Sequence, residues 1–249
     1  MRSEIFRQYD SRWANLPYPT KSYSFANNGC GCCACTHVII EQNKYKNYTP
    51  KNVRPYMVDQ GFATKGHGTT WNGITKTLEH YGFKVKTPNI GSSMSSAWKE
   101  LNKGNRAGVL LFRKGTRGGI TWTSGGHYVA FLDYKVVNGK HYFYTKDSGG
   151  RKHDGWHCYE TTMKGLLPKI WIVELPQIKP GKYFTVGKTY TLQENMNVRT
   201  GADTSYRKVG LLKKGTKITC LQTSNDGKWI RYAKHRWVCG RGETKTYIK

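Results

Sequence analysis

Acidic residues are scarce in this chain of 249 residues, which has 15 aspartates and glutamates against 41 lysines and arginines. Enzymes that cleave glycosidic bonds use two placed carboxylates, and no pair stands out among so few. The formal net charge is +26, and it is spread along the chain, since residues 177–249 alone hold 16 basic and 4 acidic residues. Such a charge favours a polyanionic partner, namely a nucleic acid, an anionic membrane surface or an anionic cell wall, over a solvated surface without a specific partner.

Long apolar runs are also absent. No stretch reaches the length of about 20 residues that a membrane-spanning helix needs, so membrane insertion is not expected. Residues 1–6 lack the apolar core of a secretory signal peptide. We therefore expect synthesis in the cytoplasm, with another route of release if the protein acts outside the cell.

Seven cysteines cannot all be paired in disulfides, because the number is odd. Four of them lie within six residues: Cys30, Cys32, Cys33 and Cys35. Structural zinc sites usually take their ligands from two pairs far apart in sequence, so no metal is predicted, and a thiolate metal site stays as an alternative. A second alternative is burial as small apolar side chains, which suits Cys33 and Cys35.

Cys30 opens an apolar stripe at helical spacing, in which Ala34 and Val38 follow. We expect a helix that begins at this cysteine, with Asn28 as its N-cap. A thiol at a helix N-terminus lies next to unpaired N–H groups and the positive end of the helix dipole, and both favour the thiolate. Cys30 is therefore the candidate nucleophile, and the glycines on either side of it should leave its sulfur uncrowded.

The first 176 residues contain helices first and strands afterwards, which predicts an α+β domain. Besides the helix at Cys30, apolar spacing and capping residues predict helices at 53–60, 71–81 and 95–103. Strands are predicted at 109–112, 127–134, 141–145 and 169–174. Residues 115–126 are rich in glycine, threonine and serine, and we expect a loop there.

Prolines and a glycine gather around residues 177–182, which we interpret as a linker. Beyond it, short strands separated by turn residues predict a small all-β barrel over residues 183–249. The predicted strands are 190–192, 197–199, 208–212, 217–221, 229–232 and 236–239.

A cysteine nucleophile needs a general base, and the base needs a group that orients it. His127 opens a predicted strand directly after Gly125-Gly126, where a substrate backbone can come close. Asp147 follows the next strand, and a hairpin brings the start of one strand beside the end of the next. With a strict two-residue turn at Asn138-Gly139, His127 would oppose Gly150 instead. We therefore predict a wider loop or a bulge in this hairpin.

Two alternatives to this assignment stay open. His127 is an ordinary core or edge histidine in the first. In the second, His37 is the base, although it lies seven residues after Cys30 on the same helix and would have to reach across two turns. Three compatible residue types in a workable order favour the set of Cys30, His127 and Asp147.

These residues resemble a known family, the papain-superfamily cysteine peptidases of the bacteriocin-leader-peptidase-like group. The resemblance is carried by Gly29-Cys30-Gly31, Gly126-His127-Tyr128-Val129, the Asp-Ser pair after a strand, Gln8-x-Asp10-x-Arg12-Trp13 and Ala97-x-x-x-Leu101-x-x-Gly104. It covers about residues 6–175 and implies a papain-like domain over residues 1–176. In that domain Cys30 is the nucleophile, His127 the base and Asp147 the orienting group.

The resemblance also implies an oxyanion hole. The family's glutamine, six residues before the cysteine, would fall at Ser24, and Gln8 from the entry segment is a second candidate. A further alternative is the backbone N–H of Cys30 together with Ser24 or Asn27. The chain departs from the family where Cys32-Cys33 replaces the usual Pro-Thr or Pro-Ser. Trp71 and Gly126 are the candidate substrate contacts of this domain.

Residues 183–249 resemble a bacterial SH3 domain of the cell-wall-targeting kind. The resemblance is carried by residues 196–201, Ser205-Tyr206, Gly210, residues 212–217, Trp229 and Trp237-Val238. It implies a binding groove, for which the candidate residues are Tyr190, Tyr206, Trp229 and Tyr232. The alternative for all four is the core of the barrel.

Together, a papain-like N-terminal domain and a small all-β SH3-like barrel imply a monomeric peptidoglycan hydrolase without a cofactor. It would bind the anionic cell wall and cleave an amide bond of the stem peptide or cross-bridge. The missing signal peptide favours a phage endolysin, made in the host cytoplasm and acting on the wall after release, over a bacterial autolysin or a hydrolase exported by a dedicated system. The alternatives are a protein or leader-peptide cysteine peptidase and a non-catalytic basic protein that binds wall or nucleic acid. No basic and aromatic pattern matches a known nucleic-acid motif, so nucleic acid is not an expected partner.

Overall fold

The computed structural model describes residues 4–91, 93–175, 183–224, 227–233, 235–242 and 245–249. These residues divide into two compact units, one ending before residue 176 and one beginning at Tyr183. The predicted linker, 177–182, lies outside the described residues. Within the described part of the chain, every helix is too short or too polar to cross a membrane.

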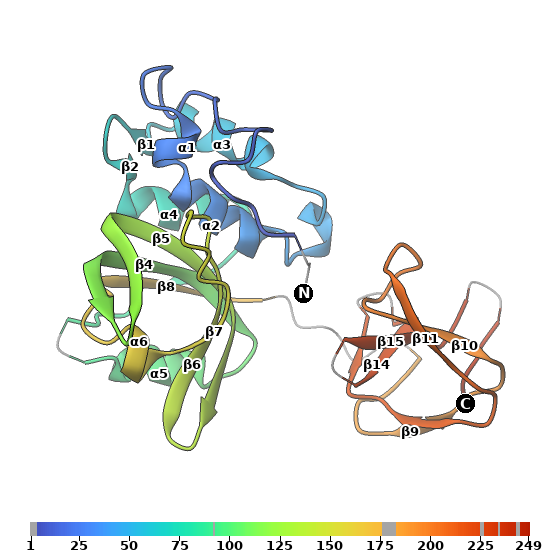
Figure 1. The fold of residues 1–249 in the computed structure, drawn as a ribbon. Coiled ribbons are helices and arrows are strands. Elements are labelled where there is room, and N and C mark those ends of the chain that lie inside the picture. Colours follow the sequence, from blue (N-terminus) through green and yellow to red (C-terminus); the bar gives the residue numbers. More distant parts are fainter. Residues whose placement is uncertain (1–3, 92, 176–182, 225–226, 234, 243–244) are drawn as a thin grey trace. The chain divides into compact units, whose positions relative to one another are not determined.

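Helices lead the first unit (Figure 1). They are α1 (Phe25–Asn28), α2 (Cys30–Ile39), the 3-10 helix η1 (Asn43–Tyr45), α3 (Pro50–Asp59) and α4 (Trp71–His80). A short hairpin of β1 (Ala63–Thr64) and β2 (Gly68–Thr69) lies between α3 and α4. α4 begins at Trp71, as predicted, and the side chain of Thr70 caps it by accepting a hydrogen bond of 3.0 Å from the N–H of Gly73.

The predicted N-cap of the cysteine helix is wrong. Asn28 is the last residue of α1, where its side chain donates to the carbonyl of Ser24, and Gly29 occupies the N-cap position of α2. Both glycines beside Cys30 are needed for close packing. A Cβ on Gly29 would lie 2.6 Å from the Phe25 ring, and one on Gly31 would lie 2.6 Å from the Cβ of Thr69.

Six antiparallel strands form the sheet of this unit, in the order β3-β8-β4-β5-β6-β7. They are β3 (Val85–Lys86), β4 (Arg106–Arg117), β5 (Ile120–Val137), β6 (Lys140–Lys146), β7 (Gly155–Cys158) and β8 (Lys169–Glu174). The loop expected at 115–126 is wrong, because β4 and β5 continue there as a hairpin. Its turn uses Gly118 and Gly119 at φ of 56° and 76°, a region that glycine enters without strain.

Helices cover both faces of this sheet (Figure 1). On one face, Val38 of α2 and Met57 of α3 belong to the same core as Val109 of β4. On the other face, α5 (Ser95–Leu101) and α6 (Tyr159–Thr162) pack against a second core, to which Leu110 of β4 contributes. Consecutive residues of one strand thus serve opposite faces. The α+β class, with helices before an antiparallel sheet, is confirmed.

The hairpin of β5 and β6 combines a tight turn with a bulge. Its turn is Asn138-Gly139, both residues having positive φ, and Val137 pairs with Lys140 across it. The register shifts by one residue between Phe131 and Asp133. The predicted bulge is therefore confirmed, and it changes which residues of β5 lie beside the end of β6.

The second unit is the predicted small all-β barrel. Its strands are β9 (Thr189–Thr191), β10 (Met196–Arg199), β11 (Lys208–Leu212), β12 (Lys217–Thr219), β13 (Gln222–Thr223), β14 (Trp229–Ala233) and β15 (Arg236–Cys239). They form a five-stranded sheet in the order β11-β10-β15-β14-β13 and a two-stranded sheet of β12 and β9. The core between them includes Phe184, Leu192, Ile230 and Val238.

The four aromatic residues expected in a groove of the barrel divide into two pairs. Tyr190 and Trp229 are only 7% exposed, and the Tyr190 hydroxyl accepts a hydrogen bond from the N–H of Thr185. For these two residues the structure supports the core alternative, because a groove-lining ring must present a face to its ligand. Tyr206 and Tyr232 are partly exposed and remain candidates for binding.

Candidate active site

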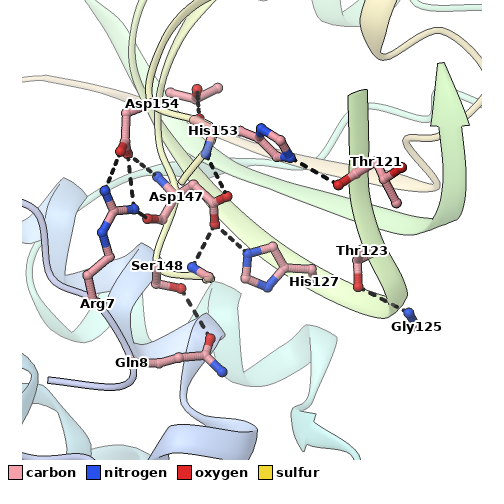
Figure 2. A network of polar contacts seen from close by, with 12 residues as sticks. Arg7, Gln8, Thr121, Thr123, Gly125, His127, Asp147, Ser148, His153 and Asp154 are labelled. Atoms are coloured by element: carbon pink, nitrogen blue, oxygen red, sulfur yellow. Dashed lines mark hydrogen bonds and ion pairs between the residues drawn. The ribbon is translucent and has the colours of Figure 1, made fainter. Parts of the chain in front are cut away.

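His127 and Asp147 lie side by side, as the sequence predicts (Figure 2). β5 places His127 opposite Phe112 of β4, and Asp147 follows directly after the last residue of β6. The Nε2 atom of His127 lies 2.7 Å from the Oδ1 atom of Asp147, and both residues are buried. Because Nε2 faces the carboxylate, Nδ1 is the ring nitrogen left for a second partner.

Cys30 is that second partner. α2 packs against β5, and both the hydrogen bond and the charge of His127 act on the Cys30 thiol. The backbone N–H groups of Tyr128 and Gly31 also act on the sulfur. The three predicted residues, which are spread over 118 positions of the chain, therefore form one continuous set of contacts.

Electrostatics favour an ion pair between the cysteine and the histidine. Burial raises the pKa of the Cys30 thiol, but the hydrogen bond and charge of His127 outweigh it, so that this pKa lies below its ordinary value. Burial lowers the pKa of His127, but Asp147 and Cys30 raise it by more, so that it lies above its ordinary value. Thiolate and imidazolium thus stabilise each other, and the thiolate is the nucleophilic form.

Asp147 is held as a carboxylate. Burial raises its pKa, but the hydrogen bond and charge of His127 and the backbone N–H groups of Gly149 and His153 lower it to about 2. The Gly149 N–H donates to Oδ1 at 2.7 Å, and the His153 N–H donates to Oδ2 at 3.0 Å. Both carboxylate oxygens therefore have fixed donors, which set the direction in which Oδ1 points at His127.

A hollow of about 530 Å³ opens at Cys30. It is lined by Asn27, Asn28, Cys30, Thr64, Gly66, His67, Gly68, Thr69, Thr70, Trp71, Leu111, Gly126 and Tyr128. The structure thus brings both candidate substrate contacts of this domain, Trp71 and Gly126, to the same hollow as the sulfur. Trp71 is 53% exposed, and a Cβ on Gly126 would have open space around it. The hollow has room for a short polar chain above the thiol.

Neither oxyanion candidate lines the hollow. The Gln8 amide bridges two parts of the site, since Nε2 donates to the carbonyl of Ala26 and Oε1 accepts from the Ser148 hydroxyl at 3.4 Å. One N–H of Nε2 is therefore engaged with Ala26. Ser24 lies at the start of α1, and its carbonyl accepts from the backbone N–H of Asn28. Asn27, between Ser24 and the cysteine, does line the hollow.

The other cysteines of the cluster are core residues. Cys32, Cys33 and Cys35 are completely buried, and burial raises the pKa of each thiol. They therefore stay protonated and unreactive beside Cys30. Among the described residues, no group of three or more His, Cys, Asp and Glu side chains is placed to hold a metal ion.

His37, the rival base, has a structural role. It is buried, stacks on the Phe6 ring at 4.9 Å, and its Nε2 accepts a hydrogen bond of 3.2 Å from the Phe6 N–H. Burial and the charges of Lys146 and Arg7 lower its pKa to about 3. The neutral ring is thus a fixed acceptor for the N-terminal segment.

Sequence patterns missed several residues that shape the site. The β1–β2 hairpin supplies Thr64 and Thr69 to the hollow, and the Thr69 carbonyl accepts a hydrogen bond of 2.8 Å from the Tyr128 hydroxyl. Behind Asp147 lie Arg7 and Asp154, whose contacts join segments almost 150 residues apart. Arg7 adjoins the predicted Gln8, but no local spacing links it to Asp154.

Comparisons with known proteins identify the second unit. Residues 194–238 match the bacterial SH3 domain family, which confirms the predicted SH3 domain at the C-terminus. No curated protein matches the chain.

Several solved structures are similar to the chain, among them the following three. The peptidase domain of Streptococcus ComA, a bi-functional ABC transporter involved in a quorum sensing pathway, is 14% identical with a TM-score of 0.42, covering 70% of this chain and 99% of that chain. A protein of Bacillus anthracis described as a C39-like peptidase is 12% identical with a TM-score of 0.39, covering 68% and 92%. Ly7917 is 15% identical with a TM-score of 0.26, covering 75% of each chain. Our assignment of roles to Cys30, His127 and Asp147 rests on their geometry.

Proposed function

We propose that this protein is a cysteine hydrolase of bacterial peptidoglycan, with Cys30 as nucleophile, His127 as general base and acid, and Asp147 as the group that orients the imidazole. The observation that carries the proposal is the position of His127, which contacts the Cys30 thiol on one side and the Asp147 carboxylate at 2.7 Å on the other. The hollow of about 530 Å³ above the sulfur gives a substrate access to this set.

The chemistry follows from the ion pair. The Cys30 thiolate attacks the carbonyl carbon of an amide, and the imidazolium of His127 gives its proton to the departing amine, so that a thioester with Cys30 remains. Neutral His127 then takes a proton from water, whose oxygen attacks the thioester and releases a carboxylic acid and the thiolate. Asp147 stabilises the imidazolium that each half of this cycle requires.

The negative charge on the tetrahedral intermediate needs donors. We propose the backbone N–H of Cys30, at the start of α2, and the Gln8 amide, which lies between Ala26 and Ser148. Neither Gln8 nor Ser24 lines the hollow, and Gln8 is favoured because its amide carries a second N–H besides the one that Ala26 accepts.

The bacterial SH3 domain is proposed to hold the enzyme on the cell wall, and the formal net charge of +26 suits anionic wall polymers. The amide bond cleaved would lie in the stem peptide or the cross-bridge, as in a phage endolysin that reaches the wall at lysis.

The test is the clearing of Gram-positive cell walls by wild type, Cys30→Ala and Cys32→Ala, with the soluble products identified by mass spectrometry. Cys32 is the matched control, because it lies two residues away but is buried with a raised pKa. We expect Cys30→Ala to abolish clearing and Cys32→Ala to retain it, and the products then name the bond. Clearing by Cys30→Ala at the wild-type rate would refute the proposal.

A further inference from the structure

The segment that carries Asp147 is held from behind by the N-terminal segment of the chain (Figure 2). One guanidinium nitrogen of Arg7, Nη1, donates to the backbone carbonyl of Asp147. The N–H of Gln8 donates to the carbonyl of Ser148 at 3.0 Å. Arg7 and Gln8 thus donate hydrogen bonds to the carbonyls of Asp147 and Ser148, two consecutive residues.

Asp154 completes this arrangement. Its carboxylate forms an ion pair with Nη2 of Arg7, and its Oδ1 accepts a hydrogen bond of 2.9 Å from the N–H of Asp147. The backbone N–H and C=O of Asp147 are therefore both bound, the first by Asp154 and the second by Arg7. Both side chains are about three-quarters buried, which strengthens the pair compared with an exposed ion pair.

We propose that Arg7 and Asp154 form a positioning pair, which fixes the backbone of Asp147 so that its carboxylate points at His127. Neither residue touches the thiol or the hollow in the structure. The proposal rests on the proposed function of Cys30, His127 and Asp147. The positioning requires the two donor nitrogens of the arginine, because one planar guanidinium binds the Asp147 carbonyl and the Asp154 carboxylate at the same time.

Loss of the pair should act on rate more than on binding. A displaced carboxylate holds the imidazolium less well, and misplacement by about 1 Å costs up to roughly 100-fold in rate. The groups that contact Asp147 in the structure are His127 from β5, Arg7 from the N-terminal segment, and Asp154 with the N–H groups of Gly149 and His153 from the loop before β7. His157 of β7 and His37 of α2 also interact with its charge. Lys146 precedes Asp147, and its charge acts with those of Arg7 and Asp147 on His37. None of the remaining groups replaces the bond from Arg7 to the Asp147 carbonyl.

The experiment uses the full chain and compares Arg7→Met, Arg7→Lys, Asp154→Asn and the double variant Arg7→Met with Asp154→Asn. The matched control is Arg12→Met, because Arg12 lies in the same segment and forms exposed ion pairs with Glu4 and Asp10. Two quantities are measured against pH: the kinetics of wall clearing, and the rate at which iodoacetamide alkylates Cys30, followed by mass spectrometry of its peptide. The thermal midpoint shows that each variant is folded.

For Arg7→Met we expect kcat to fall by about 10- to 100-fold and KM to stay within about threefold of wild type. The pH below which the alkylation rate of Cys30 falls should rise by about one unit. Arg7→Lys should recover part of the loss, because lysine supplies the charge without the fork. The double variant should be little worse than either single variant, since the two side chains act through each other. Arg12→Met should stay within about twofold of wild type in both measurements.

Two outcomes would overturn the inference. One is a folded Arg7→Met whose kcat and alkylation profile match those of Arg12→Met, and the other is losses from Arg7→Met and Asp154→Asn that simply add. Failure of the proposed function looks different, because Cys30→Ala would then clear walls. Even in that case the alkylation profile still reports whether Arg7 and Asp154 position Asp147.

Discussion

Asp147→Asn gives a sharp measure of what the carboxylate contributes. The amide is close in shape to the carboxylate, but one of its two ends donates instead of accepting. Oδ1 receives hydrogen bonds from His127 and Gly149, and Oδ2 receives one from His153. We expect the amide oxygen to stay toward His127, where it keeps two bonds, and the NH2 group to face the His153 N–H.

The magnitude follows from the pKa of Asp147. Its environment lowers that pKa from an ordinary value near 4 to about 2, which corresponds to about 2–3 kcal/mol in favour of the charged form. His127 is the largest source of this stabilisation. Loss of the Asp147 charge therefore removes about 2 kcal/mol of stabilisation from the imidazolium of His127, which corresponds to a fall of roughly 30-fold in kcat/KM.

The assay is wall clearing together with alkylation of Cys30 against pH, as for the arginine variants. Asp147→Asn should clear walls roughly 30-fold more slowly, and Cys30 should need a higher pH to react. The control is Asp59→Asn at the exposed end of α3. A folded Asp147→Asn with wild-type kinetics would refute the role of Asp147, and the alternative of His127 as an ordinary core histidine would return.

Three further predictions concern acid stability and packing. His37 is neutral in the folded protein, with a pKa of about 3, and gains a proton near pH 6.5 when unfolded. The unfolded state thus binds more protons between these values, so the free energy of unfolding should fall by about 2 kcal/mol from pH 6.5 to pH 5 on account of this residue. His37→Gln should lower the free energy of unfolding at pH 7 but remove most of its dependence on pH, as measured by urea unfolding. An unchanged dependence of this free energy on pH would contradict the prediction. Gly31→Ala should destabilise by about 1–3 kcal/mol, because its Cβ meets Thr69, whose hydroxyl is bonded to Tyr18 at 2.7 Å. Gly126→Ala has open space and should melt like wild type but raise KM by narrowing the hollow; equal melting temperatures for the two alanine variants would count against this packing.

Local signals account for the parts of the fold that the sequence predicts well. Thr70 caps α4 through a bond to a residue three positions away, and strand β8 follows from an unbroken apolar run. The types and order of Cys30, His127 and Asp147 suit cysteine hydrolase chemistry, and register alone predicts a bulge or a wider loop in the hairpin of β5 and β6.

Long-range contacts account for what the sequence could not predict. Asn28 has the residue type of an N-cap, but it is the last residue of α1, which the sequence does not reveal. Residues 115–126 look like a loop, because their strand partners are visible only when β4 and β5 are side by side. The pair of Arg7 and Asp154 joins positions 147 apart, and no spacing rule covers that distance.

This separation in sequence between Arg7 and Asp154 has a consequence for how the chain is made. Ribosomes release the chain from its N-terminus, so Arg7 and Cys30 leave the exit tunnel early and His127 follows much later. The contacts that hold Asp147 cannot form at that stage, because Asp154 and the strand after it have yet to emerge. A truncated or stalled chain that carries Cys30 and His127 therefore lacks a fixed Asp147. The contacts that fix Asp147 therefore form only when the first domain is nearly complete.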